Sequence, residues 1–97
     1  MKIYLVTLDD ICDGEVVAQE RIAYLHYEDA KEKVKKLIKS YEHDCPDIFD
    51  DKNYVIDRND DYFTAYEQGE YVINHIDIEI SELEVKEWLT YKHIHII

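Results

Sequence analysis

The sequence predicts an α+β fold in which one amphipathic helix packs on one face of a mostly antiparallel β-sheet of four to six strands. Short apolar and β-branched segments alternate with clusters of Asp, Asn and Gly, which is typical of β-hairpins. The segment 28–42 instead repeats its apolar residues at helical spacing. Because 46% of the 97 residues are apolar, with only two glycines and one proline, we expect a single domain over residues 1–97.

A β-hairpin is expected at the start of the chain. Residues Ile3–Leu8 are typical of a strand that is buried on most of its surface. Residues Asp9–Gly14 are expected to form the turn, since Asp caps its own backbone and Gly accepts a positive φ. Residues Glu15–Leu25 resume an alternating pattern whose phase breaks near Glu20. We attribute that break to a β-bulge.

The helix is predicted over Glu28–Glu42. One of its faces carries apolar residues, namely Ala30, Val34, Leu37, Ile38 and Tyr41. The opposite face carries lysines, namely Lys31, Lys33, Lys35, Lys36 and Lys39. The apolar face is expected to cover sheet residues, namely Val6, Ile22, Ile76 and Ile78. The helix should end before Pro46, whose ring cannot continue it.

An acidic loop with a short strand follows the helix. The loop Asp44–Asn53 is expected to place Ile48 and Phe49 on the core. Tyr54–Ile56 is a short strand candidate, and Asn59–Asp61 is a turn candidate.

A second hairpin is expected from Tyr62–Glu67 and Glu70–Ile80, with its turn at Gln68 and Gly69. In its last strand the isoleucines at positions 76, 78 and 80 share one face, whereas His75, Asp77 and Glu79 share the other. This alternation predicts an antiparallel sheet with one solvated face.

The last residues fit two kinds of structure. Ser81–Glu84 matches a capping box that would start a short helix carrying Val85, Trp88 and Leu89. Tyr91–Ile97 has the alternation of a strand. We therefore leave helix and strand open for residues 81–97.

Metal-ligand residue types occur without the spacing of a metal site. They are His43, Cys45, His93 and His95, with Cys12 distant in sequence. Neither C-x-x-C nor H-x3-H is present, so no metal is predicted, although assembly of these residues in space stays open. The segment Asp57–Asp61 begins like a calcium loop, but Tyr62 and Gln68 replace the Gly and Glu that the loop requires. We interpret it as a solvated acidic turn.

No catalytic residue and no cofactor are predicted. Neither serine lies in a nucleophile motif, and two glycines cannot form a phosphate-binding loop. Cys45 follows His43 by two residues, but neighbouring carboxylates raise the pKa of a thiol, which disfavours a nucleophile. We expect a protein that is not an enzyme.

The charge balance excludes some partners. Asp and Glu number 23 against 11 Lys and Arg, so the net charge is −12. Such a protein repels phosphate, and we expect direct binding neither to nucleic acid nor to an anionic membrane. No run of about 18 apolar residues and no signal-peptide pattern is present, so a cytoplasmic location with reduced cysteines is expected.

Most of the excess negative charge follows the predicted helix. Residues 42–61 contain eight acids against Lys52 and Arg58, whereas the segment 28–39 contains five lysines against three acids. We predict that the aspartates of this stretch form an acidic partner-binding surface. They are Asp44, Asp47, Asp50, Asp51, Asp57, Asp60 and Asp61.

The opening of the chain resembles small uncharacterised proteins of bacteriophages and mobile elements. Met1–Thr7 matches their M-K-[VI]-Y-x-V-T start, and a second strand and a Lys- and Glu-rich helix follow. The chain differs at the helix cap, where His26 replaces Ser or Thr, in the acidic insert Asp44–Asp61 and after Ser81. The resemblance implies a phage or mobile-element setting and supplies no activity, cofactor or site residue.

Two functions compete on these grounds. The first is a non-enzymatic inhibitor whose acidic surface mimics DNA phosphates and binds the basic groove of a host nucleic-acid-handling protein. A defence nuclease is such a target, and anti-CRISPR proteins belong to this class. The second is an assembly module that forms a homodimer through its Tyr-rich strands or its C-terminal strand.

Overall fold

The computed structural model describes residues 1–69 and 74–84, together with the backbone of residues 95–96. Its elements in chain order are β1 (Lys2–Cys12), β2 (Glu15–Tyr24), α1 (Tyr27–Asp44), the 3-10 helix η1 (Pro46–Phe49), β3 (Tyr54–Arg58), β4 (Tyr62–Glu67), β5 (His75–Glu84) and β6 (His95–Ile96).

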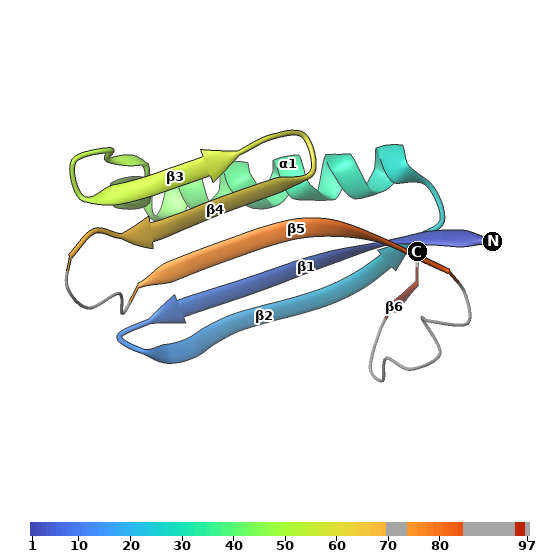
Figure 1. Ribbon diagram of the computed structural model, residues 1–97, viewed down its shortest axis with the longest axis horizontal. Helices are drawn as coiled ribbons and strands as arrows, with labels where there is room; N and C mark the ends of the chain where they lie inside the picture. Colours follow the sequence, from blue (N-terminus) through green and yellow to red (C-terminus); the bar gives the residue numbers. More distant parts are fainter. Residues whose placement is uncertain (70–73, 85–94, 97) are drawn as a thin grey trace.

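The strands form one sheet in the order β3-β4-β5-β1-β2-β6. Neighbouring strands are antiparallel, except that β6 runs parallel to β2. Helix α1 lies along one face of this sheet (Figure 1). The predicted α+β fold is therefore confirmed.

The first hairpin has longer strands than predicted. Strand β1 continues through Cys12, and the turn is only Asp13 and Gly14, both with positive φ (53° and 78°). Assigning Asp9–Cys12 to the turn was therefore wrong. Because β1 lies between β2 and β5, pairing on both sides keeps these polar residues extended.

The bulge lies three residues before its predicted position. Asp10 pairs with Ala18 and Ile11 with Val16, so Val17 is the extra residue, whereas pairing is regular at Glu20. Val16 and Val17 are each 59% exposed. Apolar residues of β2 are therefore exposed near the hairpin end. This explains why the apolar pattern predicts the bulge at the wrong residue.

Helix α1 and its packing confirm the prediction. It contains the predicted residues with one more at the start and two more at the end, and it stops before Pro46. Its residues Ala30, Val34, Leu37 and Ile38 are buried in a core that includes Val6, Ile76, Ile78 and, partly buried, Ile22. His26 occupies the N-cap without a capping side-chain hydrogen bond. Tertiary packing rather than the cap therefore stabilises this helix.

The acidic loop and the strands β3 and β4 also follow the prediction. Ile48 is buried and Phe49 packs on the core, with its ring centroid 5.4 Å from that of Phe63. Residues between β3 and β4 form the expected turn. These contacts join the loop to the core.

A second, smaller apolar cluster lies on the other face of the sheet. Ile3, Leu5 and Ala23 are at most 2% exposed, and Leu83 packs against them. Ile3 and Leu5 alternate in β1 with Val6 and Leu8 of the main core, so the strand is buried on both faces. A strand that is apolar on both faces is consistent with the continuous apolar start of the chain.

The two ends of β5 decide one open alternative and correct one predicted boundary. Ser81–Glu84 do not begin a helix but extend β5, where they pair with residues 2–5 of β1. Asn74 is not in the strand, and Glu70–Ile73 lie outside the described residues. Val85, Trp88 and Leu89 also lie outside them, and only His95 and Ile96 of the predicted last strand are seen, paired with β2.

Candidate functional site

The seven aspartates predicted to bind a partner form two groups at opposite ends of β3 (Figure 1). The η1 group consists of Asp44, Asp47, Asp50 and Asp51. The turn group consists of Asp57, Asp60 and Asp61. All seven side chains are exposed. Because β3 has five residues, at about 3.3 Å per residue it holds the groups about 15 Å apart.

Local hydrogen bonds hold part of the η1 group. Asp50 accepts the backbone N–H of Lys52 at 3.0 Å and the side-chain amide of Asn53 at 2.9 Å. Asp44 contacts His43 Nδ1 at 2.8 Å. Within the described residues, the carboxylates of Asp47 and Asp51 have no hydrogen bond or ion pair. These two are therefore the members of the group that are open to a partner.

The turn group contains one carboxylate with a structural role. Asn59 Oδ1 accepts the backbone N–H of Asp61 at 2.7 Å, which closes the turn. Asp61 accepts the hydroxyl proton of Tyr27, and this hydrogen bond, with partial desolvation and neighbouring acids, raises the pKa of Tyr27 to about 12. Asp57 accepts a hydrogen bond from Tyr62 and raises its pKa. Asp60 is the carboxylate of this group that is left to solvent.

The basic residues of the described chain neutralise acids elsewhere. Five ion pairs with nitrogen–oxygen distances of 2.9–4.0 Å join Lys2 to Glu82, Arg21 to Asp9, Lys31 to Glu28, Lys33 to Glu20 and Lys35 to Glu32. No lysine or arginine in the described ranges pairs with any of the seven aspartates. The exposed Lys52 and Arg58 lie in the same stretch as the seven aspartates, so the surface around β3 keeps a net negative charge.

The position of Asp44 is unfavourable for the helix. It is the last residue of α1, and Glu42 precedes it in the last turn. Carboxylates are destabilising at this end because the last carbonyl groups carry the negative end of the helix dipole. Helix stability therefore does not explain why acids gather here.

Strand β3 is an edge of the described sheet, but little of its backbone is free. Asn59 N–H donates to Tyr62 O at 3.0 Å, and in this register residues 55 and 57 also face β4. The outward groups of Tyr54 are used, because its N–H donates to Asp50 O and its carbonyl accepts from Gln68 Nε2. Only Ile56 and Arg58 present outward backbone groups, so side chains dominate this surface.

The metal and nucleophile candidates are not assembled by the described residues. Across residues 1–69 and 74–84 there is no group of three His, Cys, Asp or Glu that could hold a metal ion. His93 lies outside these residues, and only the backbone of His95 is described. Partial burial and the carboxylates of Asp10, Asp44 and Asp47 raise the pKa of the Cys45 thiol. The prediction that neighbouring carboxylates raise the pKa of Cys45 is therefore confirmed.

The tyrosines offer little surface for a dimer contact. Of those in the described chain, Tyr66 is the one that is more than a third exposed, at 39%. Tyr24 is buried, and the other described tyrosines are partly buried. Tyr71 and Tyr91 lie outside the described residues.

The position of β3 at the sheet edge, between two acidic groups, was not predicted. Strand order depends on long-range pairing, for which the sequence of β3 carries no local signal. No helix within the described residues is long and apolar enough to cross a membrane. Comparison of the chain with protein-family models, curated proteins and solved structures gives no match.

Proposed function

We propose that this protein binds and inhibits a protein with a basic groove, one that normally handles nucleic acid, through the acidic groups on either side of β3. The observation that carries the proposal is the uneven neutralisation of charge. Within the described residues, all five ion pairs of lysines and arginines use acids outside the two groups, whereas Asp47, Asp51 and Asp60 are exposed and unpaired.

The arrangement in two groups supports a particular kind of mimicry. A DNA duplex presents two phosphate backbones on either side of a groove, and the major groove is about 12 Å wide. The two acidic groups lie about 15 Å apart, a separation of the same order. They would therefore replace phosphates of both strands in a basic groove, rather than a single row of phosphates.

Self-repulsion supports a functional reason for these acids. A net charge of −12 on 97 residues opposes the compact state, and acids at the end of α1 add a local cost. A basic partner would neutralise the excess net charge and the acids at the end of α1. The homodimer remains the second hypothesis, with Tyr66 and the exposed Val16 and Val17 as its nearest support.

The test is capture of proteins from a bacterial lysate on the immobilised chain. The variant Asp51→Asn/Asp60→Asn removes one unpaired carboxylate from each group and leaves the structural acceptors Asp50 and Asp61 intact. The control Asp13→Asn/Glu15→Gln makes the same change of two charges in the β1–β2 hairpin.

We expect the parent and the control to retain proteins that bind duplex DNA on their own and that added duplex DNA elutes. The β3 variant should retain at least tenfold less of them. Equal retention by the two variants, or captured proteins that duplex DNA does not displace, would contradict phosphate mimicry at β3.

A further inference from the structure

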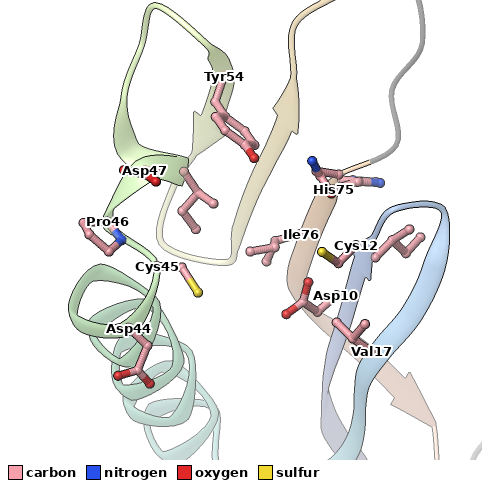
Figure 2. A pocket seen from close by; sticks show the side chains of 13 residues that line it. Asp10, Cys12, Val17, Asp44, Cys45, Pro46, Asp47, Tyr54, His75 and Ile76 are labelled. Carbon is pink, nitrogen blue, oxygen red and sulfur yellow. The ribbon is translucent and has the colours of Figure 1, made fainter.

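A cavity of about 480 Å³ adjoins the η1 group, of which Asp44 and Asp47 line it, together with Tyr54 of β3. Figure 2 shows it between the end of α1 with η1 on one side and the end of the β1–β2 hairpin on the other. Tyr54 and Ile76 project toward it from β3 and β5. Small-molecule sites in proteins commonly have volumes of about 300–1,000 Å³, so this cavity is large enough for a ligand.

The walls of the cavity are largely apolar. Ile48 and Ile76 line it and are only 7% and 5% exposed, so they form a fixed inner surface. Cys12 and Cys45 come from opposite walls (Figure 2). Because its surroundings raise the pKa of Cys45, this thiol stays protonated and acts as a small apolar group.

The charges that border the cavity are mainly negative. Asp10, Asp44 and Asp47 line it with the imidazole of His75, and the described lining residues include no lysine or arginine. Asp10 is held in place because Tyr41 Oη donates to its Oδ2 at 2.8 Å. A carboxylate accepts several hydrogen bonds, so Asp10 keeps capacity for a ligand.

Burial and nearby acids together favour the protonated forms of groups at the cavity. Partial burial is the larger cause and nearby acids add to it in raising the pKa of Cys45 and of Tyr54. The pKa of Tyr41, which binds Asp10, is raised first by burial and then by that hydrogen bond. The acids thus add to the effect of burial on each group.

The geometry points to a binding site for a small organic cation that has a primary ammonium on a short apolar body. The apolar body would lie against Ile48, Ile76 and the ring of Tyr54. The ammonium would lie against the carboxylates of Asp10, Asp44 and Asp47. Neither an anion nor a purely polar ion matches both the walls and the charge.

The first test compares ligands of the same shape and different charge, by two-dimensional amide NMR of the parent protein. They are 4-phenylbutylammonium, 4-phenylbutan-1-ol and 4-phenylbutanoate, with n-propylammonium as a cation that lacks the aromatic ring. The phenylbutylammonium should shift the amide signals of residues 10–12, 44, 45, 47, 48 and 74–76 in a saturable manner, since Pro46 has no amide N–H. It should bind at least tenfold more tightly than the alcohol or n-propylammonium, and the carboxylate should not bind.

The second test changes the charge at the cavity. Asp44→Asn/Asp47→Asn should weaken binding of 4-phenylbutylammonium at least tenfold and leave that of the alcohol unchanged. Asp51→Asn/Asp60→Asn removes the same charge outside the cavity and should change the affinity less than twofold at 0.15 M salt. Asp51 and Asp60 are not among the described residues that line the cavity, so this comparison separates binding in the cavity from binding at the rest of the surface around β3.

Three results would overturn the assignment. One is equal affinity for the ammonium and the alcohol. Another is a set of shifted amides that is spread over the protein or centred elsewhere. The third is the same loss in both double variants, which would indicate a diffuse attraction to the net charge of −12 instead of a site.

Discussion

Asp9 shows how single residues handle the negative charge of the sheet. Arg21 Nη2 donates to both oxygens of Asp9, at 2.9 and 3.2 Å, and Gln19 Nε2 donates to Oδ1 at 2.8 Å. In the next strand Asp77 lies directly opposite Asp9, and its Oδ1 is buried without a hydrogen-bond partner among the described residues. Like charges directly opposite in a sheet are destabilising, so Arg21 compensates for this pair.

Replacing Arg21 tests that role. Partial burial acts to raise the pKa of Asp9, but hydrogen bonds from Gln19 and Arg21 and the charge of Arg21 outweigh it, so the pKa is lowered. Arg21→Gln should lower the free energy of unfolding by about 1 kcal/mol at pH 7, a modest value because water screens the partly exposed pair.

The free energy of unfolding that Arg21→Gln loses should become smaller as the pH falls. An acid whose pKa is lower in the folded state stabilises the fold above its unfolded pKa of 3.8, and this stabilisation disappears as the pH falls through the folded value. The difference between parent and Arg21→Gln in urea unfolding should therefore be full at pH 5 and above and shrink toward pH 3. A difference that stays constant over this range would assign Arg21 a packing role only.

At the scale of elements, α1 is stabilised by its buried face. Leu37 is 9% exposed within the core, whereas Lys35 lies on the outer face and pairs with Glu32 at 3.5 Å, both side chains being 63% exposed. Burial of apolar surface stabilises far more than an exposed ion pair does. The two faces should therefore respond differently to truncation.

Truncation of these two residues gives a direct comparison. Leu37→Ala should destabilise the protein by about 2–4 kcal/mol, since it removes buried methyl groups and leaves a cavity. Lys35→Ala should cost less than about 0.5 kcal/mol. Denaturant titrations measure both values, and equal effects would mean that Leu37 is not part of the core.

The elements differ in how well local sequence predicts them. The helix follows from the spacing of Ala30, Val34 and Leu37, because that spacing directly reflects the buried face. Asp9–Cys12 resembles a turn in composition but is a strand, because the two neighbouring strands supply partners that the local sequence does not encode. Helix and strand were both open for Ser81–Glu84, and pairing with β1 makes the segment a strand despite its capping pattern.

The acidic groups and the cavity also differ in how well local sequence predicts them. The seven aspartates were identifiable because acidic composition is a local property, and their exposure agrees with it. The edge position of the strand that separates them was not, since strand order depends on long-range pairing. The cavity lay beyond reach because its walls come from β1, β2, α1, η1, β3 and β5, whose proximity only the fold creates.

At the scale of the whole molecule, the charge is divided between surfaces. The exposed lysines at positions 35, 36 and 39 lie on α1, whereas the aspartates of the two groups lie around β3. A molecule with such a division approaches a basic partner in a preferred orientation, because its field acts before contact. The rate of association is therefore the quantity most sensitive to the proposed surface.

The final prediction concerns that rate for a basic partner isolated by the capture experiment. Asp51→Asn/Asp60→Asn should slow association several-fold at 0.05 M salt and change dissociation little, since exposed charges act mainly on encounter. Raising the salt to 1 M shortens the Debye length from roughly 10 Å at 0.1 M to about 3 Å, so parent and variant should then associate at similar rates.

The control Asp13→Asn/Glu15→Gln, which carries the same net charge as the variant, should associate nearly as fast as the parent at every salt concentration. Stopped-flow measurements distinguish the outcomes. If the control slows association as much as the variant does, net charge alone steers the encounter. If neither variant has an effect at low salt, the partner does not bind the surface around β3.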